Sequence, residues 1–248
     1  MTRFISQVHG DIRRTRLTRR GATHRPADVP RGLHKEYPRM PRIVLPAPTA
    51  ISDSLTAVLE KRHSCRDCGP AALSLQECST LLGSALKGRG NGADRNYPSG
   101  GALYPIETYL ITTALEGLAP GIFHYHPTAH ALERLWDLPT GFDMKDAVGK
   151  PEDLRPTSLL VFTSVWKRSS AKYGDFSYPL ALLEAGHMSE NIVLISAALG
   201  LCACPMAGFE DQVVNKLLDI GETEQAVHSI TLGRKADKSG EAERESED

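Results

Sequence analysis

The chain has 248 residues, of which 41% are hydrophobic and 24% are charged, and its formal net charge is −1. This composition is ordinary for one globular domain and excludes a collagen-like, a disulfide-scaffold or a fully disordered chain. No apolar run approaches the ~18 residues of a membrane span, and the Arg-rich start lacks the apolar stretch of a secretory signal, so we expect a cytoplasmic protein with no membrane partner.

The small net charge conceals a basic N-terminal arm. Residues 1–50 hold 11 Lys/Arg and 3 Asp/Glu, whereas residues 51–232 hold 14 basic and 21 acidic residues. We therefore expect a basic, Pro-rich arm at 1–50, a single domain at 51–235 and an acidic, disordered tail at 236–248. Because no aromatic pattern interleaves with the basic residues, nucleic acid is not expected as a partner, and part of the arm should pack on the acidic body.

Regular patterning begins after residue 52. Leu55, Val58 and Leu59 have helical spacing, which predicts a helix that ends near Arg62. A second helix should follow Ser74, because the sequence from 74 to 77 has the S-x-x-E pattern of a capping box. A loop rich in Gly, Asn and Asp then occupies residues 88–101.

The rest of the chain alternates strand and helix patterns. The apolar run at 158–165 predicts a central buried strand, and the stretch 179–200, apolar on most faces, predicts a buried central helix. Further strands are predicted at 107–114, 121–126, 131–136 and 226–232, and a short helix at 210–218.

Cysteine and histidine spacing raises the question of a metal. An odd count of five cysteines without a signal peptide predicts reduced thiols. Zinc ligation by Cys65, Cys68, Cys202 and Cys204 is one interpretation, but the second spacing is tighter than usual, so small apolar packing residues are favoured. The three histidines at 124, 126 and 130 are expected on an exposed strand face and turn, and no metal is expected.

Three separate segments could bind a ligand. Residues 62–66 combine cations with a hydroxyl, which suits a phosphate or the polar edge of a flavin, although cations also favour any helix C-terminus. Residues 98–101 carry two glycines that allow close backbone approach, and 204–209 is a stretch of small residues. Each could equally be an ordinary turn or connection. No nucleophile elbow, Walker loop, dinucleotide fingerprint or H-E-x-x-H motif accompanies them.

The order of these segments resembles the nitroreductase-like flavoprotein superfamily. The resemblance runs from about Leu33 to Gly233 and is strongest to the SagB-type dehydrogenases of thiazole/oxazole-modified peptide biosynthesis. Arg62-His-Ser-Cys-Arg66 is similar to the family's flavin motif, and residues 95–105 resemble the branch's R-x-x-P-S-x-G-x-x-Y-P segment. The hairpin at 121–132 and the Leu-Glu-Ala-Gly-His run at 183–187 also match.

The resemblance implies an α+β fold, with a mixed sheet flanked by helices, and intertwined homodimers with FMN at the interface. Arg62, His63, Ser64 and Arg66 would bind FMN, and Pro98, Ser99 and Gly100 would approach the ring from the other subunit. The remaining face or edge of the ring would meet Pro205, Met206 and Gly208. A basic residue near the C-terminus would close the phosphate site, with Arg234, Lys235 and Lys238 left open.

The resemblance also implies an activity. A Lys-Tyr pair before the long helix, here Lys172 and Tyr173, is assigned to catalysis in this branch. The implied reaction is FMN-dependent oxidation of azoline rings to azoles in a ribosomally made peptide, after cyclisation by a cyclodehydratase. Arginines usual after the tyrosine are missing from 174–178, and Arg168 is a candidate substitute. An NAD(P)H-dependent nitro or quinone reductase and a non-catalytic partner subunit remain alternatives.

Overall fold

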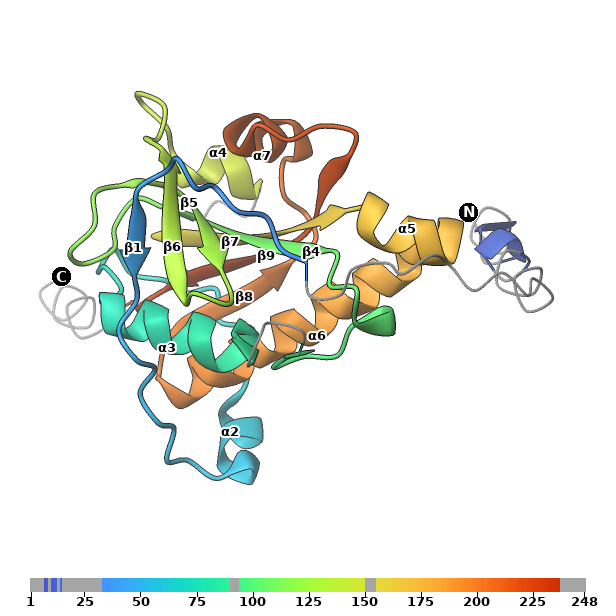
Figure 1. The fold of residues 1–248 in the computed structure, drawn as a ribbon. Helices are drawn as coiled ribbons and strands as arrows, with labels where there is room; N and C mark the ends of the chain where they lie inside the picture. The colour runs from blue at the N-terminus through green and yellow to red at the C-terminus, as the bar shows by residue number, and fades with distance from the viewer. Residues whose placement is uncertain are drawn as a thin grey trace, which may run out of the picture.

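A single antiparallel sheet with helices on both faces forms the molecule, in a computed structural model that describes residues 7–8, 10–12, 14, 33–89, 94–149 and 155–236 (Figure 1). The strand order is β1-β6-β5-β4-β7-β9-β8. The strands are β1 (Arg42–Val44), β4 (Ile106–Thr112), β5 (Gly121–His126), β6 (Ala131–Trp136), β7 (Ser158–Val165), β8 (Cys202–Met206) and β9 (Glu224–Gly233). A separate two-stranded ribbon pairs β2 (Gly88–Arg89) with β3 (Asp94–Arg95).

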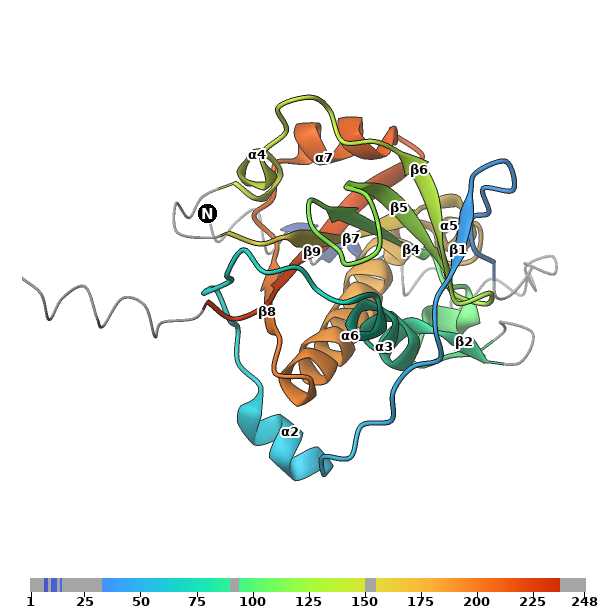
Figure 2. The same cartoon turned by 90° about the vertical axis from the view of Figure 1, so that its left-hand side faces the viewer.

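Helices lie in two layers, one on each side of the sheet. In Figure 2, α3 and α6 lie below the sheet, α4 and α7 lie above it, and α2 projects from the base. The helices are α2 (Leu55–Lys61), α3 (Leu75–Leu86), α4 (Met144–Val148), α5 (Lys167–Tyr173), α6 (Ser177–Ala198) and α7 (Asp211–Leu218), with short 3-10 helices at Gly100–Ala102 and Gly174–Phe176. The α+β class expected from the resemblance is confirmed.

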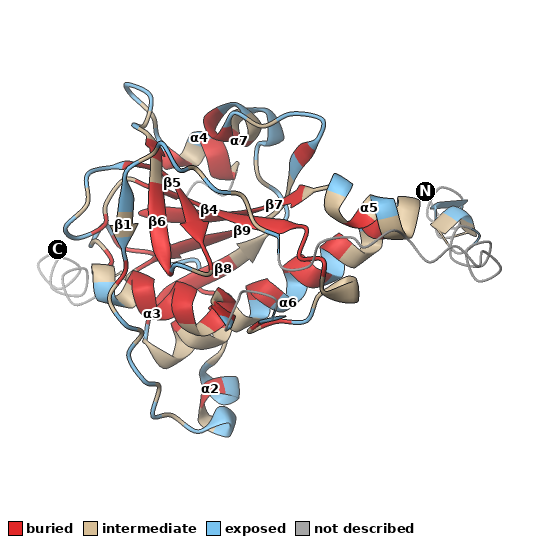
Figure 3. Ribbon diagram, viewed as in Figure 1, coloured by how far each residue is buried: buried red, intermediate tan, exposed pale blue. Residues whose placement is uncertain are grey.

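The central strands are buried on both faces because each face is covered by helices (Figure 3). Successive side chains of a strand point to opposite faces. On β4, Leu110 belongs to the core under α3 and α6, whereas Tyr109 and Ile111 belong to the core under α4 and α7. This two-sided burial explains why β7 is a continuous apolar run, as the sequence analysis predicted.

Local signals in the sequence predicted several elements correctly. The side chain of Ser74 accepts the backbone N–H of Glu77 and the Glu77 carboxylate accepts the N–H of Ser74, so the capping box is confirmed. The long helix predicted at 179–200 is α6. The sequence analysis did not predict β1, α4, α5 or β8, and the loop it predicted at 88–101 contains β2, β3 and a short 3-10 helix. β1 has three residues and α4 has five, too few to show a period.

The histidine prediction was wrong. His124 is 0% exposed, and His126 and His130 are 5% exposed each, so none lies on an open face. β5 is an internal strand between β6 and β4, and the arm covers its polar face: the His34 ring contacts His126, and the Tyr37 ring lies near His124. Part of the arm, from residue 33, therefore packs on the body. The tail was predicted at 236–248, and its residues after 236 lie outside the described ranges.

The prediction that all the thiols are reduced was wrong for two of them. Cys65 and Cys202, 137 residues apart in sequence, form a disulfide. They meet because the segment after α2 runs beside β8, where the N–H of Cys65 donates to Ala203 O at 2.9 Å. Cys68 and Cys204 are free and buried. No helix in the described ranges is long and apolar enough to cross a bilayer.

Candidate active site

The first and third candidate segments, 62–66 and 204–209, lie side by side. Residues 62–66 follow α2, whose N-terminus is capped by Ser54, and the disulfide and the Cys65 N–H bond fix this segment to β8. β8 ends at Met206, and Pro205 and Met206 are both half-buried. Gly208, two residues further on, is exposed. The structure therefore brings together two segments that are well separated in the sequence.

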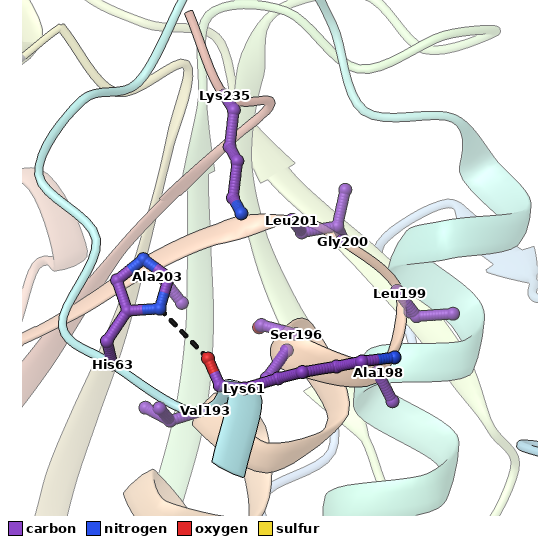
Figure 4. Close-up of a pocket in the computed structure, with 11 residues that line it drawn as sticks. Lys61, His63, Val193, Ser196, Ala198, Leu199, Gly200, Leu201, Ala203 and Lys235 are labelled. Atoms are coloured by element: carbon purple, nitrogen blue, oxygen red, sulfur yellow. Dashed lines mark hydrogen bonds between the residues drawn. The ribbon is translucent and has the colours of Figure 1, made fainter. Parts of the chain in front are cut away.

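A cavity of about 560 Å³ lies between this segment, the end of α6 and residue 235 (Figure 4). Its basic lining residues are Lys61, His63 and Lys235, and the His63 ring bonds Lys61 O at 2.9 Å. The other lining residues on α6 and β8 are small or aliphatic and include Ser196 and Ala203. The Lys61 ammonium is paired with Asp53 at 2.7 Å, so it is the Lys235 ammonium, beside small residues, that favours an anionic ligand such as a phosphate.

The two C-terminal basic residues within the described range have different surroundings. Arg234 does not line the cavity: its guanidinium donates to Glu77 at 2.8 Å and to Ala72 O at 3.0 Å. The Lys235 side chain instead points into the cavity (Figure 4). Lys238, the third candidate, lies outside the described residues. Lys235 is therefore placed to meet an anion, whereas Arg234 ties the C-terminal segment to α3.

The second segment, 98–101, lies beside the proposed catalytic pair. Gly101 has φ +68°, a left-handed conformation that glycine adopts without strain. A Cβ built at Gly101 would come within 2.6 Å of Tyr173 Oη and 2.7 Å of Lys172 Nζ. The Lys172 ammonium also lies 5.2 Å from the Tyr173 ring centroid. A larger residue at 101 would displace these two side-chain ends and would be strained at this positive φ.

The 98–101 loop and the cavity are at opposite ends of α6 in one chain. The Ser99 hydroxyl contacts Glu184 in the first half of the helix, whereas Ser196 lines the cavity. At ~1.5 Å of rise per residue, these two helical positions are roughly 18 Å apart. One chain therefore holds two half-sites, and the structure does not bring residues 98–100 together with residues 62–66.

Arg168 has a structural role. It precedes Lys172 by one turn on α5, and its guanidinium is 2.5 Å from Glu107 Oε1 and donates to Tyr104 O at 3.2 Å. Its side chain is only 9% exposed. Arg168 thus anchors α5, and with it Lys172, to β4 and the segment before it. Lys172 and Tyr173 lie at the end of a helix and not in a loop.

Two buried carboxylates near the site were missed by sequence reasoning. Glu107 on β4 is 2% exposed and bonds His124 and Arg168, which together hold its pKa well below the usual range despite burial. Glu184 on α6 is also 2% exposed, and burial raises its pKa to about 7. Glutamates within apolar stretches at 106–112 and 179–185 are a signal that could have identified both.

A histidine pair with an acid near the arm has metal-like spacing. His34 Nε2 lies 3.2 Å from His126 Nε2, and Glu36 Oε1 is 3.4 Å from the first and 3.7 Å from the second. However, Ala129 N–H donates to Nδ1 of His126 at 3.0 Å. An Nδ1 that accepts leaves the proton on Nε2, which then has no lone pair for a metal. This tautomer argues for a hydrogen-bonded pair.

The fold is that of a nitroreductase-type oxidoreductase. The chain belongs to the nitroreductase family, whose model matches residues 59–234. It is 29% identical to the nitroreductase-family protein MJ1384 of Methanocaldococcus jannaschii, over 68% of this chain and 85% of that protein.

Two further relatives process peptides. The chain is 32% identical to the microcin B17-processing protein McbC of Escherichia coli, over 62% of this chain and 60% of that protein. It is 25% identical to the trifolitoxin-processing protein TfxB of Rhizobium leguminosarum, over 88% of this chain and 63% of that protein. The aligned region thus spans about three fifths of each.

Solved structures agree in fold. A nitroreductase-family protein from Ralstonia eutropha superposes with a TM-score of 0.68 at 26% identity, covering 79% of this chain and 90% of that one. The E. coli microcin synthetase McbBCD complex, bound to a truncated microcin precursor, contains a chain with a TM-score of 0.64 at 27% identity, covering 76% of each chain.

Proposed function

We propose that this oxidoreductase uses FMN to oxidise azoline rings to azoles in a ribosomally made peptide, in the cytoplasm and with a cyclodehydratase as partner. The observation that carries the proposal is the meeting of Lys172 and Tyr173 over Gly101 of the 98–101 loop. The similarity to two peptide-processing proteins and to a chain of the microcin synthetase complex supports the peptide substrate.

The residues present fit FMN. The cationic cavity suits a phosphate, with Lys235 and His63 on its wall, and the neighbouring Ser64 and Arg66 are exposed and available to the rest of the cofactor. Arg62 would act in the same segment, although it now lies 4.0 Å from Glu190. Pro205, Met206 and Gly208 would line the ring in this subunit, and Pro98, Ser99 and Gly100 would approach from a partner subunit.

The chemistry divides between cofactor and protein. When bound, FMN supplies the two-electron acceptor that amino-acid side chains lack. Lys172, in its neutral form, would take the ring Cα proton as general base, and the Tyr173 hydroxyl beside it would orient the amine or relay the proton. Arg168 keeps α5 in place, so the base is positioned before the substrate arrives.

A homodimer would complete the site, and α6 offers the surface for it. α6 is apolar on most faces, but not all of its large apolar side chains are buried. Tyr178, Leu182 and Leu183 are 52%, 40% and 60% exposed. An exposed apolar face on the helix that separates the half-sites suits a second copy of the chain. We propose that this copy places its 98–101 loop against the first chain's cationic cavity.

Charging this face should separate the subunits. We expect Leu183→Glu to yield monomers in light scattering and to lose FMN, since each flavin would need both chains. Val44→Glu is the matched control, because Val44 is 73% exposed on β1, away from α6. A Leu183→Glu protein that stays dimeric and yellow would contradict this interface.

Replacing Lys235 tests the phosphate end. We expect Lys235→Ala to weaken FMN binding about three- to tenfold in a fluorescence titration, because a partly solvated charge-assisted contact is lost. Arg234→Ala should lower stability more than FMN affinity, since Arg234 bonds Glu77 and Ala72. Equal affinities for wild type and Lys235→Ala would remove Lys235 from the phosphate site.

Mass spectrometry tests the activity. The FMN-loaded protein, incubated with a peptide already cyclised to azolines, should remove two hydrogen atoms per ring. No mass change on a fully cyclised peptide, with FMN bound, would contradict the proposal. The family match also supports a second candidate, an NAD(P)H-dependent nitro or quinone reductase. Bleaching of bound FMN by NADPH, followed by nitroaromatic turnover, would favour it.

A further inference from the structure

A buried acid lies behind the 98–101 loop. Glu184 on α6 is 2% exposed, and one carboxyl oxygen, Oε2, contacts Ser99 Oγ closely. The other oxygen, Oε1, has no hydrogen-bond partner within the described part of the chain. The Ser99 hydroxyl also accepts the backbone N–H of Tyr104 at 2.9 Å. Ser99 itself is half-buried, so it lies between the buried acid and solvent.

The hydrogen bonds of the two arginines near Glu184 go to other partners, and within the described residues the buried Arg95 Nε has none. Arg95 donates to Tyr97 Oη at 2.8 Å and to Leu33 O at 2.9 Å, and Arg168 is bonded to Glu107 and Tyr104 O. A buried carboxylate with an unpartnered oxygen is unfavourable, which favours the neutral acid. Burial accordingly raises the pKa of Glu184 to about 7, although the Ser99 hydrogen bond, the charge of Arg95, the backbone N–H of Ile106 and the charge of Arg168 oppose the rise.

The Ser99 hydroxyl has two hydrogen-bonding states, which depend on whether Glu184 carries a proton. A serine hydroxyl has one proton and two lone pairs. If Glu184 is ionised, the Ser99 O–H must donate to it, which leaves Ser99 only a lone pair for a third partner. If Glu184 is protonated, its O–H donates to Ser99. The Tyr104 N–H and the Glu184 O–H then fill both lone pairs, and the Ser99 proton is free to point outward.

We propose that Glu184 is a positioning residue whose proton decides whether Ser99 donates or accepts a hydrogen bond on the outer side of the 98–101 loop. This inference rests on the proposed function, in which Ser99 approaches FMN. An oxidised flavin presents mostly acceptor atoms along its polar edge, so it is bound best while Glu184 is neutral and Ser99 donates. Rising pH removes that donor and weakens binding.

The test measures FMN affinity from about pH 5.5 to about pH 8.5. Wild-type protein should bind FMN about three- to tenfold more weakly at the alkaline end, the effect of one neutral hydrogen bond. Glu184→Gln keeps a hydrogen-bond donor toward Ser99 at every pH. Its FMN affinity should therefore be independent of pH and close to that of wild type at the acidic end of the range. The FMN affinity of Ser99→Ala should also be independent of pH, and close to the weaker affinity of wild type at the alkaline end. Glu116→Gln, an exposed acid on a loop, should behave as wild type.

A second readout needs no cofactor. The carbon-13 shift of the Glu184 carboxyl, followed in the FMN-free protein, should titrate near neutrality, and titration near the ordinary value for glutamate would overturn the inference. FMN binding that is independent of pH in wild type, or an inflection retained in both Glu184→Gln and Ser99→Ala, would overturn it as well. If Glu184→Gln does not fold, Ser99→Ala decides. Absence of FMN binding at all pH values would overturn the proposed function itself.

Discussion

Replacing Lys172 by alanine should lower the rate of azoline oxidation by roughly 10²- to 10⁴-fold, the usual contribution of a positioned general base. Lys172 Nζ lies over Gly101, so removing the side chain deletes the proton acceptor at the loop that would face the flavin. FMN binding should persist, because Lys172 is on α5 and the cationic cavity is at the far end of α6. The decrease should therefore appear in kcat at saturating FMN.

A lysine on the same helix provides the control. Lys167 is exposed at the start of α5, and Lys167→Ala removes the same charge without touching Gly101. We expect it to keep wild-type turnover. If Lys172→Ala turned over azoline peptide at the wild-type rate with a full complement of FMN, the base would have to be another group. Loss of FMN in Lys172→Ala would instead show that the pair binds the cofactor.

Local patterns explain which parts of the fold the sequence predicted. The α3 helix begins with a capping box and β7 is a single apolar run, and both signals lie within a few residues. α5 has no such signal. Its residues, Lys-Arg-Ser-Ser-Ala-Lys-Tyr, lack apolar periodicity, and Arg168 ties the helix to Glu107, which is 61 positions earlier. A pattern read from neighbouring residues cannot predict a contact between residues so far apart in the sequence.

The same limit applies to the candidate site. Motif order identified 62–66, 98–101 and Lys172-Tyr173, and the structure shows Gly101 against that pair and 62–66 against β8. Motif order did not show that Arg234 bonds Glu77, nor that Glu184 lies under Ser99, since both depend on side-chain packing. The burial of His124 was not predicted because the segment that covers it, 34–37, lies about 90 residues earlier in the sequence. The contact of His34 with His126, 92 residues apart, is an example.

The largest effect on stability is expected at Glu107. Its carboxylate accepts from the Lys35 backbone N–H at 2.6 Å, lies 2.5 Å from Arg168 and bonds His124 Nε2 at 2.8 Å. His124 bonds Glu133 through its other nitrogen at 2.9 Å. Burial alone would lower the pKa of His124, but these two carboxylates raise it. Glu107 therefore connects the arm, the sheet and α5.

Replacing Glu107 by glutamine keeps the shape and removes the charge. We expect Glu107→Gln to lower the free energy of unfolding by about 3–5 kcal/mol, because the buried Arg168 and the imidazolium of His124 lose their counter-charge. Urea unfolding at neutral pH would measure this loss. Glu116→Gln, at an exposed loop position, should stay within about 0.5 kcal/mol of wild type. A similarly small change for Glu107→Gln would show that the ion pairs contribute no net stability.

The pH dependence of this difference gives a second check. His124 and Arg168 hold the pKa of Glu107 below its unfolded value, so the stability from Glu107 is complete above about pH 4.3 and is lost as pH falls toward the folded pKa. Wild type should therefore lose stability on acidification more steeply than Glu107→Gln, and the two curves should converge in acid. Parallel curves would mean that the destabilisation comes from altered packing around residue 107, because only the loss of an ionised carboxylate makes the difference depend on pH.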